Sequence, residues 1–250
     1  MLKRKYAALV AALAVWSCGS VREEPIDALP ASPGSMDQST MLLEAMSRTL
    51  STARTFTLRA TREIDAALTE TGTGKQLDDL YFEVRRPDRL HMISRTDGSV
   101  QHIYFDGESV VLYNATDQVY ATMPFKGTID SMITVLHESI GYIPPLAQFV
   151  LNDSWPAFQE QLGGSSPVSN EAVNGIECRK LRLMGMRAIA YIWIARQNNL
   201  PCALTATFAD VDGDPQVRIR FLEWNFAPQL SDAVFHFTPP AGARVVPMAP

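Results

Sequence analysis

The sequence predicts a mainly β, α+β domain: a strongly curved, antiparallel half-barrel of about eleven strands, with an N-terminal helix and a midchain helical insertion that plugs the concave face. Three observations lead to this prediction. Apolar and polar residues alternate with a period of two over most of residues 55–121 and 176–226. Turn pairs such as Asp106-Gly107 and Asn174-Gly175 separate the alternating segments. Helical periodicity is confined to residues 37–53 and 128–162.

The first 17 residues are typical of a secretory signal peptide. A basic start at residues 3–5 precedes an apolar run that is too short to span a bilayer, which takes about 20 apolar residues. The following Val-Trp-Ser-Cys stretch resembles the lipobox of bacterial lipoproteins, although Trp16 is larger than usual at its position. We therefore expect Cys18 to carry lipid. The alternative is ordinary signal cleavage nearby, which gives a soluble periplasmic protein.

Residues 18–36 predict a lipidated cysteine followed by a flexible tether, because they contain three prolines and no apolar periodicity. Gly19 rather than Asp follows the cysteine. By resemblance to the sorting of bacterial lipoproteins, this indicates an outer-membrane anchor on the periplasmic side. Residues 37–250 then form one domain.

The charge of the exported part restricts its partners. Removing residues 1–17 takes three positive charges from a formal net charge of −5 and leaves −8. Such acidity argues against nucleic acid as a partner, and against electrostatic binding to anionic lipid. The remaining chain of about 230 residues is long enough to bury a large core as one domain.

The elements follow in order along the chain. Ser35 and Gln38 have capping-box spacing at the start of the first helix. A long strand is expected over residues 55–68, because its even positions are mostly apolar and its odd positions mostly polar. Short strands follow around residues 80–84, 90–92, 103–105, 110–112 and 119–121.

The second half continues this pattern after the helical insertion of residues 128–162, which ends at Gly163-Gly164. Four strands are expected at residues 176–184, 188–196, 202–210 and 216–226. Residues 188–195 are apolar on both faces, so this strand is expected to be central and covered on both sides.

Two cysteines remain if Cys18 carries lipid. Cys178 and Cys202 are a disulfide candidate in an oxidising periplasm. Strands one apart would place their Cα atoms about 9 to 10 Å from each other, too far for a disulfide without a bulge or a loop crossing. Two buried, inert thiols are the alternative.

No catalytic or metal-binding pattern is present in the sequence. The four histidines are scattered, although His91 and His102 are expected on neighbouring strands, and no third ligand has metal-site spacing. Asp210, Asp212 and Asp214 have a glycine in the wrong place for a calcium loop. We therefore expect no enzymatic activity, no cofactor and no metal.

Several motifs together resemble the predicted periplasmic proteins of domain of unknown function 2092, over most of residues 40–247. The motifs are Arg-Arg-Pro-Asp-Arg-Leu at 85–90, Tyr-Phe-Asp-Gly at 104–107, Gly-Thr-Ile-Asp at 127–130, Pro-Pro-Leu-Ala at 144–147, Val-Asn-Gly-Ile-Glu-Cys at 173–178, Trp-Ile at 193–194, Leu-Pro at 200–201, Trp-Asn at 224–225 and Phe-His-Phe-Thr-Pro-Pro at 235–240. The resemblance implies a fold similar to the lipoprotein carriers LolA and LolB and to LppX, with acyl chains held on the concave face of a half-barrel.

Two functions from different classes remain open. The first is a lipid-anchored protein that binds or carries a hydrophobic ligand, an acyl chain, lipid or lipoprotein, with the helices as a gate. The second is an envelope interaction or sensing module, similar to the LolA-like domain of RseB, whose cavity is packed shut and whose surface binds a protein partner. Plain core is the alternative to a ligand role for every predicted cavity residue. The predicted cavity residues are Phe56, Leu58, Phe82, Met92, Phe105, Leu112, Trp193 and Phe221.

Overall fold

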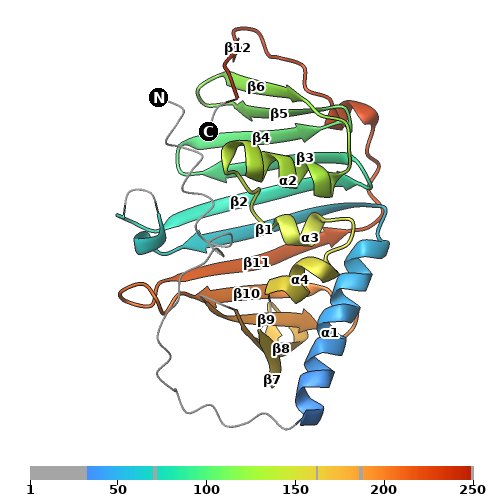
Figure 1. Cartoon of the computed structure of the whole chain (residues 1–250), viewed down its shortest axis with the longest axis vertical. Helices are drawn as coiled ribbons and strands as arrows, with labels where there is room; N and C mark the ends of the chain where they lie inside the picture. The colour runs from blue at the N-terminus through green and yellow to red at the C-terminus, as the bar shows by residue number, and fades with distance from the viewer. Residues whose placement is uncertain (1–32, 70–71, 162, 186–187, 249–250) are drawn as a thin grey trace.

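The computed structural model describes residues 33–69, 72–161, 163–185 and 188–248, and in them one open sheet of twelve strands is the dominant feature (Figure 1). The predicted signal peptide, Cys18 and most of the predicted tether lie outside the described residues. The predicted fold class is confirmed: the protein is mainly β, with one N-terminal helix and further helices in midchain.

The sheet consists of two meanders that join through their first and last strands. The strand order is β12-β6-β5-β4-β3-β2-β1-β11-β10-β9-β8-β7, with every neighbouring pair antiparallel except β12 and β6. The pairing of β1 with β11 therefore closes a long loop in the chain and makes one sheet of both halves. The strands are β1 (Thr55–Ile64), β2 (Gln76–Arg85), β3 (Arg89–Thr96), β4 (Ser99–Phe105), β5 (Ser109–Asn114), β6 (Val119–Pro124), β7 (Gly164–Val173), β8 (Ile176–Met184), β9 (Ile189–Ala195), β10 (Pro201–Thr207), β11 (Gln216–Asn225) and β12 (Arg244–Val245).

Helices cover one face of this sheet, which we call the inner face. The segment between β6 and β7, called here the helical insertion, carries α2 (Ile129–Ile140), α3 (Ala147–Val150) and α4 (Trp155–Gln161) across that face (Figure 1). Thr128 caps α2 in a capping box with Ser131, and Gly141 ends the helix with a φ of 68°. The opposite face of the sheet is called the outer face.

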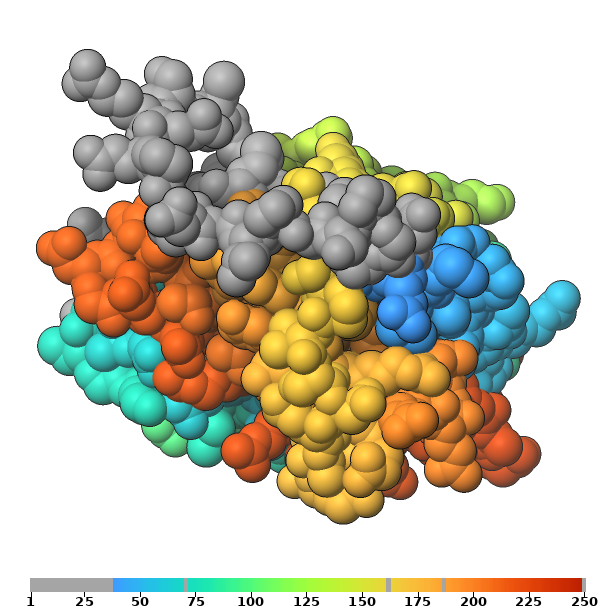
Figure 2. Space-filling model, turned by 90° about the horizontal axis from the view of Figure 1, so that it is seen from below, coloured from blue at the N-terminus to red at the C-terminus, as the bar shows by residue number. Residues whose placement is uncertain are grey.

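The N-terminal helix lies at the β7 end of the sheet. Helix α1 (Pro33–Thr52) packs against the edge strand β7 and lies beside that end of the molecule in Figure 2. Its apolar stripe of Leu43, Met46 and Leu50 is fully buried in the same core as the inner sheet residues. The helix begins at Pro33, so Ser35 lies inside it and the predicted capping box is wrong.

Three strand predictions need correction. Strand β1 ends at Ile64, because residues 66–68 form a short 3-10 helix. Strand β7 was not predicted: as an edge strand it is polar and largely exposed, and so lacks the apolar alternation of a buried strand. Strand β9 is not central, because only β8 and β7 separate it from the edge. The hairpin at Asn174-Gly175 is confirmed, with positive φ at both residues, as a type I′ turn requires.

Candidate functional site on the inner face

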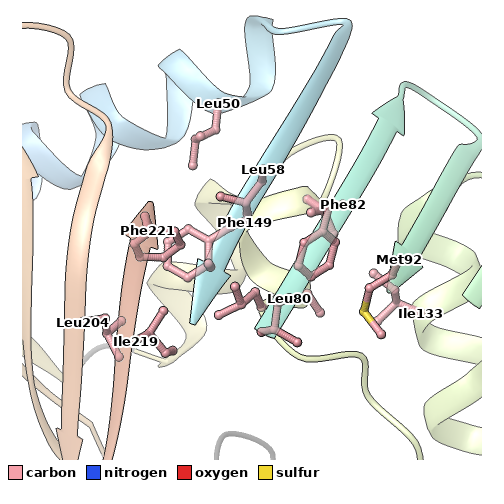
Figure 3. Packing of buried hydrophobic residues seen from close by; sticks show 14 of the residues in the cluster. Leu50, Leu58, Leu80, Phe82, Met92, Ile133, Phe149, Leu204, Ile219 and Phe221 are labelled. Atoms are coloured by element: carbon pink, nitrogen blue, oxygen red, sulfur yellow. The ribbon is translucent and has the colours of Figure 1, made fainter. Parts of the chain in front are cut away.

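Seven of the eight predicted cavity residues lie on the inner face and belong to one continuous buried cluster. None of them exposes more than 6% of its surface. Figure 3 shows Leu58, Phe82 and Met92 from neighbouring strands gathered with Phe149 and Ile133 from the helices. The period-two alternation therefore assigned these side chains to the correct face. The seven are Phe56, Leu58, Phe82, Met92, Phe105, Leu112 and Phe221.

The helical insertion covers these side chains with apolar residues of its own. Ile129, Met132 and Leu136 of α2 are fully buried in the cluster, as are Phe149 and Val150 of α3. The ring of Phe149 meets that of Phe221 edge-on, with centroids 4.8 Å apart. In this structure protein side chains, rather than solvent, therefore cover the predicted ligand face.

Arg86 ties the insertion to the rim of the sheet. Its guanidinium donates to the carbonyl oxygen of Leu151 (2.6 Å) and to that of Ala53 (2.8 Å), at the ends of α3 and α1. It also lies 4.9 Å from the ring centroid of Phe56. Burial lowers the pKa of Arg86 to about 10, which leaves the group charged at neutral pH.

One ion pair interrupts the apolar inner face. Arg62 and Asp78 lie opposite each other on β1 and β2, and Arg62 Nε donates to Asp78 Oδ2 over 2.7 Å. Arg62 exposes 2% of its surface and Asp78 none. The sequence interpretation missed this pair, but a signal was present, because Arg62 stands between Ala60 and Ile64 on the even positions of β1, and Asp78 stands next to Leu80 on those of β2.

Trp193 lies apart from the other seven residues. On β9 the inner positions are Ile192 and Ile194, which places Trp193 on the outer face and only partly buried. Its indole N–H donates to Glu171 over 2.8 Å, and Lys180 lies 4.9 Å from its ring centroid. The apolar run over residues 188–195 gave no alternation by which the face of Trp193 could be assigned.

The two predicted disulfide cysteines meet on the outer face. Cys178 and Cys202 are both buried free thiols, grouped with Ala195 in a small cluster of their own. Pro201 pairs with Ile194 and Ala203 with Trp193, so Cys202 is the extra residue of a β-bulge. Burial and the neighbouring Cys178 thiol raise the pKa of Cys202 to about 12. The bulge supplies the distortion that a bond across β9 requires, and bonding stays a prediction.

The expected neighbourhood of His91 and His102 is confirmed. His91 Nε2 lies 3.1 Å from His102 Nδ1, and the other nitrogen of His91 bonds Glu83 over 2.7 Å. Tyr104 stacks on His91 with ring centroids 4.3 Å apart. Burial, followed by His91 and Arg95, lowers the pKa of His102 to about 4. No group of three or more potential metal-ligating side chains occurs in the described part of the chain.

The outer face also carries a groove of about 620 Å³ beside these rings. Its floor is formed by β1, β2, β3 and β11, and one wall by residues 228–230 after β11. The lining mixes both signs of charge with apolar groups, a composition that suits a polar or peptidic guest better than an acyl chain. The lining includes Arg59, Arg95, Glu83, Glu223, Tyr81 and Leu230.

A family model described as "Predicted periplasmic protein (DUF2092)" matches residues 39–249. The chain belongs to this family. The matched range begins within α1 and includes every strand of the sheet. No curated protein sequence matches the chain.

Solved structures of other proteins are similar to this member of the family. An uncharacterized conserved protein from Thermus thermophilus has a TM-score of 0.48 at 12% identity, over 83% of this chain and 97% of that chain. LprF from Mycobacterium bovis has a TM-score of 0.45 at 10% identity, over 84% and 99%. The Pseudomonas aeruginosa MucA/MucB complex gives 0.45 at 14% identity, over 84% and 63%. At such identities no ligand or partner is transferred from these proteins.

None of the described helices of this DUF2092 protein combines the length and the apolar character needed to cross a bilayer.

Proposed function

We propose that this protein is an exported, non-catalytic carrier that binds a hydrophobic ligand, an acyl chain, lipid or lipoprotein, on the inner face of its sheet. The proposal rests on which elements cover that face. The apolar cluster of that face is closed by α1 and by three helices of 12, 4 and 7 residues within one insertion, and not by a second sheet. Because apolar burial is non-directional, an apolar guest can take the place of the helix side chains.

The polar attachments of the insertion support its role as a gate. Pro87 O accepts from Ile129 N (2.9 Å) and from Asn152 Nδ2 (3.0 Å), next to the bonds of Arg86 with the end of α3. These bonds all lie at the turn between β2 and β3. The insertion is also bonded to the turn between β4 and β5, through Gly127 N and Gly107 O (3.2 Å), and to α1, through the hydroxyl groups of Ser154 and Ser47 (2.7 Å). Apolar packing holds the remaining cover, so movement of the insertion away from the sheet with the rim bonds kept requires the bond to Ser47 to break.

The predicted lipidation of Cys18 indicates where in the cell the protein is located. We propose that lipid on Cys18 anchors the domain to the periplasmic side of the outer membrane. Cys18→Ala should move the protein from the membrane fraction to the soluble periplasmic fraction, with Cys178→Ser as the matched control. Unchanged membrane fractionation of Cys18→Ala would remove lipidation as the cause.

The carrier proposal is tested first on protein purified from its native host. Organic extraction followed by lipid mass spectrometry should yield a bound lipid in stoichiometric amount, counted separately from acyl groups linked to Cys18. A well-folded protein without lipid that also fails to bind a hydrophobic fluorescent probe would contradict the proposal.

A reversible lock on the insertion tests the gate itself. The hydroxyl oxygens of Ser47 on α1 and Ser154 before α4 lie 2.7 Å apart, and both side chains are buried. Ser47→Cys together with Ser154→Cys places two thiols within reach of a disulfide. Oxidation should lower probe binding roughly tenfold, a change of about 1.4 kcal/mol, and reduction should restore it. Ser47→Cys alone is the control, and binding that is equal in both redox states would contradict the gate.

The second candidate function is an envelope interaction module with a permanently packed core. The full burial of the inner face and the mixed-charge groove on the outer face favour this function. In that case the purified protein carries no lipid, and Arg59→Glu in the groove weakens binding of a protein partner without changing probe binding.

A further inference from the structure

Arg62 and Asp78 form an ion pair that is almost fully buried on the inner face, and apolar residues of the neighbouring strands lie beside it. Arg62 lies in register with Ile219 of β11 on one side and with Asp78 on the other. Ile219 and Leu80, the latter in register with Ala60, are both buried and visible in Figure 3. A charge in such a place requires partners for all its polar atoms.

Asp78 has a full set of partners. Its Oδ1 accepts from Thr96 Oγ1 (2.6 Å) and from Gln76 Nε2 (2.9 Å), and its Oδ2 accepts from Arg62 Nε (2.7 Å). This carboxylate is therefore fixed by three donors from three directions. Its role is to hold the guanidinium of Arg62 in one orientation.

The guanidinium of Arg62 does not have a full set of hydrogen-bond partners. Within the described residues its guanidinium makes a hydrogen bond only through Nε. Nη2 forms an ion pair with the same Oδ2 of Asp78 over 2.5 Å, although its geometry is not that of a hydrogen bond. The planar guanidinium carries five N–H donors, and its fork matches the two oxygens of a carboxylate or phosphate. Arg62 itself lies on the same face of the sheet as the apolar cluster.

Polarity therefore changes along the inner face. The end of the face at Arg62 also contains Ser94 and Thr96 of β3, whereas Phe82 lies in register with the apolar Leu58 and Met92. Phe56 lies about 20 Å from Arg62 along β1, at about 3.3 Å per residue, and the guanidinium of Arg86 beside its ring already donates to carbonyl oxygens. We propose that Arg62 binds the anionic head of an amphiphile, a carboxylate or a phosphate, whose apolar chain lies along the inner face toward Phe82 and Phe56. This inference rests on the proposed carrier function and names the chemical class of its ligand.

The test compares two probes that differ only in head charge. cis-Parinaric acid and its methyl ester are titrated into the full-length protein at about pH 8, where the carboxylate is ionised. The acid should bind roughly tenfold more tightly than the ester, because only the acid pairs with Arg62. General electrostatics oppose this result, since the protein has a formal net charge of −5.

The variant must not leave a lone buried charge. Arg62→Gln is therefore combined with Asp78→Asn, which keeps the approximate shapes and removes both charges. The double variant should bind acid and ester equally, with ester affinity within about twofold of the unmutated protein. Arg220→Gln, at an exposed position of β11, is the matched control and should keep the preference for the acid.

The outcomes separate this inference from the carrier proposal. Equal binding of both probes by the unmutated protein overturns the head-group site and leaves the carrier proposal standing, whereas binding of neither probe overturns both. If the double variant does not fold, competition on the unmutated protein decides: decanoate and decyl phosphate should displace the acid, and decanol should do so at least about tenfold less well. Displacement by inorganic phosphate at equal concentration would indicate a site for a free anion and overturn the amphiphile.

Discussion

The inner and outer faces of β2 differ in how their side chains are held, although the residues alternate along one strand. Phe82 on the inner face is fully buried by apolar packing alone. Its neighbour Glu83 on the outer face bonds His91, which in turn bonds His102. Apart from the bonds of Asp78 at one end, the inner face thus depends on non-directional burial, and the outer face on bonds with defined partners.

This difference indicates which face can change its cover. A hydrogen bond between two named atoms is lost when its partner moves, whereas an apolar surface accepts any apolar cover of similar shape. The outer face holds Phe237 of the C-terminal segment among Tyr104, Tyr113 and Tyr120. Exchange of cover is therefore expected on the inner face, where the helical insertion lies, and not on the outer face.

The largest effect should come from the packed inner face. Phe82→Ala should lower the free energy of unfolding by about 3 to 5 kcal/mol, because it opens a void in the core. Tyr81→Ala, one residue away on the outer face, should lower it by less, because Tyr81 borders the open groove. Urea denaturation measures both. Equal losses at the two positions would contradict the difference between the faces.

The second-largest change in the free energy of unfolding is expected from the thiol pair on the outer face. If Cys178 and Cys202 are oxidised in the periplasm, reduction should lower the free energy of unfolding by about 2 to 4 kcal/mol. Thiol alkylation of the denatured, unreduced protein should then label neither position. The matched control is Cys178→Ser, which removes the bond and should make stability insensitive to reductant. Two alkylatable thiols in the unmutated protein would end the disulfide prediction.

Much of this architecture was predictable from the sequence because alternation and turns are local signals. The hairpin at Asn174-Gly175 and the inner position of Leu58 both follow from a few neighbouring residues. Strand β7 was missed because an edge strand does not need an apolar face. The pairing of β1 with β11 and the place of Trp193 depend on contacts that no local pattern encodes.

The candidate site, like the fold, could be predicted from the sequence only in part. Its apolar wall could be assigned by counting every second residue, but Arg62 and Asp78 were passed over because they are polar at apolar positions. Their meaning depends on pairing across two strands, which brings one beside the other. The attachment of Arg86 to the end of α3 is likewise tertiary, since 65 residues separate Arg86 from Leu151.

A smaller effect should come from pH at the histidine cluster. The pKa of His102 is lowered from 6.5 to about 4, so its ring stays neutral in the folded protein at pH values where the unfolded chain takes up a proton. Stability from this group is complete above about pH 6.5 and is lost as the pH falls toward 4. After a discount for the solvent that reaches the ring, the loss is on the order of 1 kcal/mol. His102→Phe should remove that part of the slope of unfolding free energy against pH, and an unchanged slope would refute the assignment.

The smallest effect, and the finest test of the comparison, concerns Trp193. Its N–H is the largest cause of the lowered pKa of Glu171, which stands at about 2, and Ser169 and Lys180 contribute less. Trp193→Phe keeps an aromatic ring but removes that donor, so the pKa of Glu171 should rise toward 4.5 without reaching it. The stability that the lowered pKa of Glu171 contributes is present above pH 4.5 and is lost as the pH falls through about 2. The free energies of unfolding of the variant and the unmutated protein should therefore become equal in strong acid. Carboxyl-detected NMR titration measures the pKa directly.

The same variant should bind the hydrophobic probe as the unmutated protein does, because Trp193 lies on the outer face; a changed affinity would mean that the ligand does not reside on the inner face alone.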